Sequence, residues 1–166
     1  MKAIISTGQG RLHLMQSAEW LVKAGVDMRV LTGWMPRKAD NLLIRVASKL
    51  VGRNLSAGFQ KRIDGAKWFA VNPCAWVEFL DHIMRQICTR LFHCTTKYVA
   101  TWSWKAFGWQ SRRFLRDADI FHVRSGAGHG GAIGCARRRG MRIVVDHSIA
   151  HPQYMGEHLR EEFLRN

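Results

Sequence analysis

The stretch from residue 118 to residue 152 constrains the fold of this chain more than any other. It contains two apolar runs, 120–123 and 143–145, which are separated by a glycine cluster and a short basic segment. This pattern predicts two parallel strands joined by a helix in a right-handed crossover. Both strands then end at the same edge of the sheet, which is the edge where open α/β sheets bind their ligands.

Polar residues follow both of these strands. Arg124, Ser125 and Gly126 come after the first strand, and His147 and His151 come after the second. We expect any ligand site of the chain to lie where these residues meet. An imidazole can donate a hydrogen bond whether or not it is charged, so a ligand contact is favoured for His147 over a structural role.

The opening of the chain has the same order of strand, helix and strand. Residues 2–6 are a short apolar run, residues 11–24 carry apolar side chains at helical spacing, and residues 28–32 form the next run. A third strand is expected at residues 67–71 and a helix at residues 74–92. The sequence therefore predicts an α/β fold, with a Rossmann-like parallel sheet flanked by helices in a single domain that spans all 166 residues.

The first strand is followed by a glycine turn at Gly8, Gln9 and Gly10. The backbone N–H groups of such a turn can bind a phosphate or a sugar at the start of the next helix. A tight turn without a ligand explains the glycines equally well, because glycine adopts backbone angles that other residues avoid.

A second glycine cluster, residues 126–131, reads Gly-Ala-Gly-His-Gly-Gly and follows a predicted strand. It matches the glycine pattern of dinucleotide-binding turns, and Asp146 lies where that pattern has an acidic residue. Against dinucleotide binding, the motif follows the fourth predicted strand rather than the first. The structural alternative is that the glycines let a helix begin close to the sheet.

The segment between the second and third strands predicts a basic amphipathic helix, with Asp40 as its N-terminal cap. The apolar side of this helix carries Leu42, Leu43, Val46, Leu50 and Val51. The basic side carries Arg45, Lys49 and Arg53. The expected fold thus has a basic helical region between strands of the sheet.

The charge of the chain predicts anionic partners. Lys and Arg total 26 against 12 Asp and Glu, which gives a formal net charge of +14. Residues 85–116 contain seven basic residues and no acidic one, together with Trp102, Trp104, Phe107, Trp109 and Phe114. Packing of these rings on the sheet and contact with a lipid surface both fit this composition, and both are favoured over nucleic acid. No stretch approaches the roughly 18 apolar residues of a membrane span, so any membrane contact is expected to be peripheral.

Metal binding and serine hydrolysis are not predicted. The four cysteines form no C-x-x-C pair, and Cys88, His93 and Cys94 have no evident fourth ligand. The nucleophile elbow G-x-S-x-G is absent from the sequence. We expect buried reduced thiols, no metal, and a cytoplasmic protein, since the apolar run at residues 3–5 is too short for a signal peptide.

Four segments, in their order and spacing, resemble the N-terminal half of a GT-B glycosyltransferase of the family 4 type. They are residues 2–10, 25–32, 118–126 and 145–154. The resemblance implies a Rossmann-like acceptor domain and a second, C-terminal Rossmann-like domain that binds most of the nucleotide-sugar and carries an E-x7-E pair of carboxylates. It implies transfer with retention of the anomeric configuration, with no metal and no cofactor besides the nucleotide-sugar substrate.

The resemblance also assigns roles to single residues. Gly8 and Gly10 correspond to the glycine loop beside the donor diphosphate, and His147 corresponds to the polar residue that ends the fifth strand. Arg124 takes the position where many family members have a histidine that touches the donor sugar. The arginine is a departure from the family pattern.

From this resemblance we expect half an enzyme. No E-x7-E segment follows His151, so the second nucleotide-sugar-binding domain is expected to be absent and transfer by the isolated chain to be negligible. The expected partners are a nucleotide-sugar, a glycan or lipid-linked acceptor, and a C-terminal domain or partner subunit. Family members commonly sit on the inner face of the cell membrane. The alternative is a non-enzymatic, basic Rossmann-like module that binds a nucleotide, a dinucleotide or an anionic membrane surface.

Overall fold

The computed structural model describes residues 1–8, 13–36, 38, 42–51, 54, 56–67, 70–90 and 96–146.

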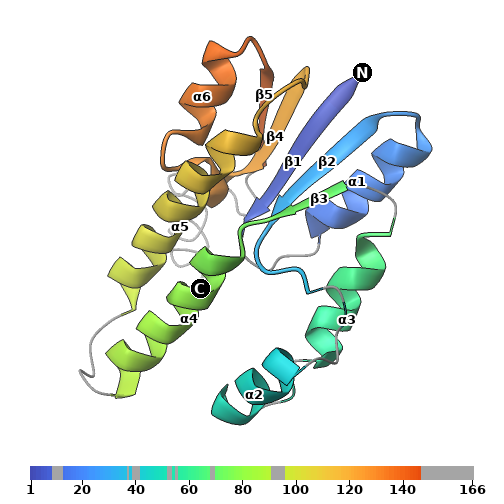
Figure 1. Cartoon of the computed structure of the whole chain (residues 1–166). Coiled ribbons are helices and arrows are strands. Elements are labelled where there is room, and N and C mark those ends of the chain that lie inside the picture. Colours follow the sequence, from blue (N-terminus) through green and yellow to red (C-terminus); the bar gives the residue numbers. More distant parts are fainter. Residues whose placement is uncertain are drawn as a thin grey trace, which may run out of the picture.

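The chain forms a five-stranded sheet in which all neighbouring strands are parallel, in the order β3-β2-β1-β4-β5 (Figure 1). The strands are β1 (Lys2–Gly8), β2 (Asp27–Thr32), β3 (Ala70–Pro73), β4 (Ile120–Arg124) and β5 (Arg142–Asp146). Six helices and two short 3-10 turns connect and cover them in the described part of the chain. They are α1 (His13–Lys23), α2 (Leu42–Val51), α3 (Ser56–Gly65), α4 (Ala75–Arg90), α5 (Lys97–Ser111), η1 (Arg112–Phe114), η2 (Ser125–Gly128) and α6 (Ala132–Arg138). The predicted α/β, Rossmann-like fold is confirmed.

Both faces of the sheet are covered by helices, as its apolar strands require. Side chains alternate along β1, so Ile4 faces a core cluster formed with α4, α5 and α6, whereas Ala3 and Ile5 face a second cluster formed with α1. The third strand lies at Ala70–Pro73 rather than at 67–71, because its register is set by pairing with β2.

The predicted basic helix between β2 and β3 exists as α2, but two of the residues predicted on its apolar side, Leu42 and Val46, are exposed. Ile44 is fully buried and packs with Phe59 of α3, while Leu42 is 77% exposed and Val46 is 48% exposed. Contact with α3 decides that Ile44 is covered. The periodicity of a short helix cannot show that choice. Asp40 and the side chains of Leu43, Leu50 and Val51 lie outside what the structure describes.

Helix α5 lies unusually close to the turn that follows β4, and glycines make this approach possible. A Cβ atom on Gly108 of α5 would lie 1.7 Å from the carbonyl oxygen of His129. A Cβ atom on Gly130 would lie 2.0 Å from the carbonyl oxygen of Lys105. The two backbones are therefore in direct contact, and α5 is fixed over one face of the sheet.

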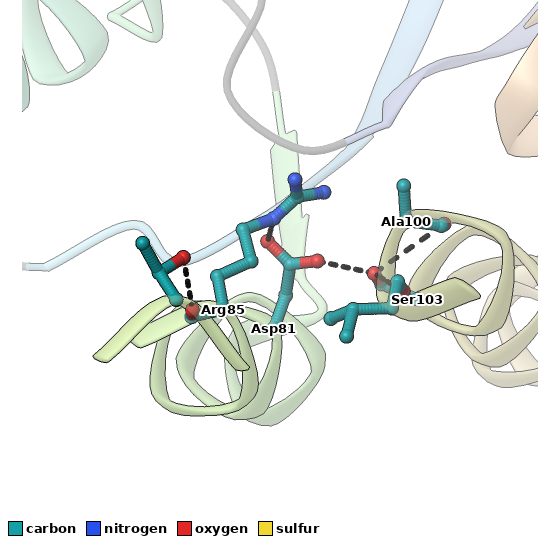
Figure 2. Close-up of polar contacts among 6 residues, drawn as sticks. Asp81, Arg85, Ala100 and Ser103 are labelled. Atoms are coloured by element: carbon teal, nitrogen blue, oxygen red, sulfur yellow. Dashed lines mark hydrogen bonds and ion pairs between the residues drawn. The ribbon is translucent and has the colours of Figure 1, made fainter. Parts of the chain in front are cut away.

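Helices α4 and α5 are joined by a polar contact as well as by apolar packing (Figure 2). Arg85 Nε donates a hydrogen bond of 2.8 Å to the Asp81 carboxylate. The Ser103 hydroxyl of α5 donates to the other oxygen of the same carboxylate and lies 2.6 Å from the carbonyl oxygen of Val99. Asp81 is only 9% exposed, so these contacts compensate the cost of burying its charge.

The aromatic residues of α5 separate into two groups. Phe107 is fully buried and Trp104 is half-buried, whereas Trp102 is 44% exposed and Trp109 is 57% exposed. One helix thus carries both rings that pack in the core and rings that are exposed to solvent. In the ranges that the structure covers, no helix is long and apolar enough to cross a membrane.

The contact between α5 and the turn after β4 predicts a large effect of Gly130→Ala. Gly140→Ala is the matched control, because both glycines have positive φ (66° and 74°) but no atom would lie within 4 Å of a Cβ on Gly140. The control should lower the free energy of unfolding by about 1–2 kcal/mol through the positive φ alone. Gly130→Ala should lower it by roughly 2 kcal/mol more, because α5 must move. Urea unfolding measures the free energy of both variants, and equal decreases would contradict the close contact.

Candidate functional site

The candidate site lies at the carboxyl ends of β1 and β4. Strands β2 and β3 extend the sheet on one side of β1, and β4 and β5 extend it on the other side. Open α/β proteins bind ligands at such a switch point between the two halves of the sheet. β1 ends at Gly8 and β4 ends at Arg124, after which Ser125 and Gly126 begin the turn η2.

The predicted set of site residues is only partly described. Gly8 and Arg124 are the last residues of β1 and β4, and Ser125 and Gly126 begin η2, so all four lie near the ends of the first and fourth strands, as the sequence indicated. Gln9, Gly10, His147 and His151 lie outside the described residues, and their part in the site stays a prediction.

Trp104 of α5 connects the described residues of this site. A Cβ atom on Gly8 would lie 2.2 Å from the indole of Trp104, and one on Gly126 would lie 2.8 Å from the same ring. The two glycines therefore leave the space that the indole fills. Sequence reasoning missed Trp104 here, because its neighbours along the chain suggested only core packing or lipid contact. The sequence feature that could have indicated this position is the pair of glycines at the ends of the first and fourth strands, Gly8 and Gly126, which leave space for a large side chain.

Arg124 supplies the charge of the site. Its residue is 7% exposed, and its guanidinium carbon lies 5.7 Å from the centroid of the Trp104 ring, in a cation–π contact. Asp146, at the end of β5, lies opposite Arg124 in the register of the two strands. A guanidinium is charged at all physiological pH values and matches phosphate and carboxylate groups in shape, so the site suits an anionic ligand.

The glycine cluster at residues 126–131 has a structural role at several of its positions. Gly126 contacts Trp104, Gly130 contacts the backbone of α5, and Gly131 adopts a φ of 83° at the N-terminal cap of α6. The geometry supports the structural interpretation of these glycines. Dinucleotide binding stays a hypothesis.

Cys74, Cys88 and Cys135, which lie in the described ranges, form no disulfide there. Burial raises the pKa of the Cys74 thiol to about 11, which outweighs the opposite effects of Ser111 and Arg113. Cys74 is therefore a neutral, unreactive thiol at physiological pH. In the described ranges no group of three or more His, Cys, Asp or Glu residues could hold a metal ion.

Comparisons with known proteins give little further information. No family model matches the chain, and no curated protein matches it. Among solved structures, the chain is similar to the C-terminal domain of PF1911 hydrogenase from Pyrococcus furiosus, with 13% sequence identity, 88% of this chain and 91% of that chain covered, and a TM-score of 0.47. The assignment of the fold therefore rests on the strand order given above.

The position of Trp104 predicts that Trp104→Ala destabilises the fold much more than Trp102→Ala. The Trp104 ring fills the space over two glycines and packs against the core, so its loss should cost about 3 kcal/mol. Trp102 is 44% exposed, and its loss should cost less than about 1 kcal/mol. Chemical unfolding of both variants measures this difference. Similar midpoints for the two would contradict the assignment of Trp104 to the site.

Proposed function

We propose that this chain is the N-terminal, acceptor-side domain of a retaining GT-B glycosyltransferase, which transfers a sugar from a nucleotide-sugar to a glycan or lipid-linked acceptor. The observation that carries the proposal is the buried Arg124 at the carboxyl end of β4, which pairs with β1 and shares the contact of Gly8 with Trp104. This is the edge of the sheet where the resemblance to the family expects the donor diphosphate and the donor sugar.

The chemistry of such a transfer fits a fixed cation at this position. When the bond between the sugar and the diphosphate breaks, negative charge grows on the leaving phosphate oxygen. A cation that is already held in place stabilises this charge without reorganisation in the transition state. The stacking of Arg124 on Trp104 restricts the guanidinium in this way.

Arginine also changes what the site can do compared with the histidine of many family members. A histidine can lose its proton near neutral pH, whereas an arginine cannot. We therefore assign Arg124 to charge stabilisation and orientation of the donor rather than to proton transfer. The net charge of +14 would draw an anionic donor towards the domain, with a rate that falls as salt increases.

A second Rossmann-like domain is part of this proposal. It would come from the same polypeptide or from a partner subunit, and it would supply most of the nucleotide contacts and the catalytic carboxylates. The isolated chain should accordingly show negligible transfer, because the groups that stabilise the transition state come from both domains.

The proposal predicts the effect of Arg124→Ala in an enzyme that combines this chain with its second domain. We expect kcat to fall about 100-fold, because a preorganised charge at the leaving group is lost. Arg124→Lys should retain part of the activity, and Arg137→Ala, an exposed arginine on α6, should retain all of it. Steady-state assays over a panel of nucleotide-sugars provide the measurement. A kcat of the Arg124→Ala variant within about twofold of the parent value would contradict the proposal.

The exposed face of α5 supports a second candidate function, association with an anionic bilayer surface. Tyr98 is 82% exposed, and it shares one helix face with Trp102, Lys105 and Trp109, which are also exposed. The opposite face of α5 is buried against the sheet. Rings beside ammonium groups suit the boundary between water and lipid headgroups. On this proposal the domain sits peripherally on the inner face of the cell membrane.

This second function predicts a specific loss of vesicle binding. The variant Tyr98→Ser/Trp102→Ser should bind phosphatidylglycerol vesicles about tenfold more weakly than the parent, because two interfacial rings are removed. Trp20→Ser is the control, since Trp20 is 70% exposed but belongs to α1 on the other face of the sheet. Vesicle sedimentation at low salt compares the three proteins. Equal binding by all of them would exclude α5 as the contact.

A further inference from the structure

A second basic site lies at the other edge of the sheet. An open pocket of about 330 Å³ is formed where α5, η1 and α6 meet. Its lining residues are Trp109, Gln110, Arg112, Arg113, Cys135 and Arg139. The helices α5 and α6 both precede a strand of the parallel sheet, so their C-terminal ends lie at the edge where the strands begin (Figure 1). The pocket is therefore remote from Arg124.

Three guanidinium groups surround this pocket without a matching carboxylate. No ion pair joins Arg112, Arg113 or Arg139 to an acidic side chain of the described residues. The sequence has no acidic residue at positions 82–116 or 120–145. Asp117 and Asp119 lie between these segments and line a neighbouring cavity with Arg139, but neither forms an ion pair with it. No ion pair among the described residues therefore neutralises the arginines of the pocket.

A structural explanation accounts for only part of this arrangement. Arginines are favoured at helix C-termini, where they meet the partial negative charge of the last carbonyl groups. Arg113 Nε donates to the carbonyl oxygen of Gln110, and Arg139 Nη1 donates to that of Arg112, both at 3.3 Å. Each bond uses one of the five N–H groups of a guanidinium. The guanidinium carbon of Arg113 also lies 5.5 Å from the centroid of the Phe114 ring. These contacts leave other N–H groups of the three guanidinium groups for a ligand.

One further residue of the pocket fits the carbon part of a ligand. Trp109 is 57% exposed, so its ring offers an apolar surface at the pocket. The volume exceeds what a single phosphate group fills, which leaves space for the carbon atoms attached to it.

We propose that the pocket formed by Arg112, Arg113 and Arg139 binds a phosphate monoester group, with Trp109 packing against the carbon part of the ligand. Guanidinium groups are the side chains best suited to bidentate phosphate recognition. The phosphate comes either from a small soluble phosphate ester or from a lipid headgroup. This site is separate from the proposed donor site and does not depend on the glycosyltransferase assignment.

The test uses the full chain and two probes of the same chemistry. Calorimetric titration with glycerol 3-phosphate measures binding of a soluble ester, and sedimentation with phosphatidylcholine vesicles that contain phosphatidic acid measures binding of a lipid headgroup. The pocket variant is Arg112→Gln/Arg139→Gln. The charge-matched control is Arg137→Gln/Arg138→Gln, which removes two exposed arginines of the same region that do not line the pocket.

We expect the pocket variant to bind at least one probe about tenfold more weakly than the parent, because charge-assisted hydrogen bonds are lost, while the control stays within about twofold. Loss with glycerol 3-phosphate identifies a soluble ligand, and loss with vesicles alone identifies a lipid headgroup. Arg112→Lys/Arg139→Lys, which keeps both charges and disturbs the fold least, should bind with intermediate affinity. The proposal would be overturned if the parent protein bound neither probe, or if both glutamine variants weakened binding equally.

Discussion

Helix α5 lies against the turn after β4 so closely that no side chain fits between the two backbones. Gly108 and Gly130 make this possible, and Trp104 fills the adjacent space over Gly8 and Gly126. The position of α5 then determines several other features at once. It holds the indole beside Arg124, it presents Tyr98 and its neighbouring rings outward, and it brings Arg112 and Arg113 of the following turn η1 next to α6.

The buried charges of this domain are held by specific contacts rather than by solvent. Arg124 stacks on Trp104, and Asp81 receives hydrogen bonds from Arg85 and Ser103. A buried charge costs several kcal/mol without such contacts. The Asp81 contact joins α4 to α5, so it also supports the position of the helix on which the site depends.

Four arginines lie in two regions of the domain with different surroundings. At the carboxyl edge of the sheet, Arg124 is nearly buried and lies opposite Asp146 in the strand register. At the amino edge, Arg112, Arg113 and Arg139 surround an open pocket with no acidic partner among the described residues. The first environment favours orientation of a ligand, and the second favours recruitment of an anion from solution.

The sequence by itself determined the strands along the chain, because apolar runs and glycine turns are local signals, and their parallel direction, because helices separate them. It also indicated that Gly8, Arg124 and Gly126 lie near the ends of the first and fourth strands, whereas the tertiary structure placed these two strands side by side. Only the tertiary structure decided that Ile44 rather than Leu42 is the covered side of α2, that Trp104 turns towards the glycines, and that three arginines meet at one pocket. These features depend on contacts between residues far apart in the chain, and the periodicity of a single helix does not specify which of its neighbours it will touch.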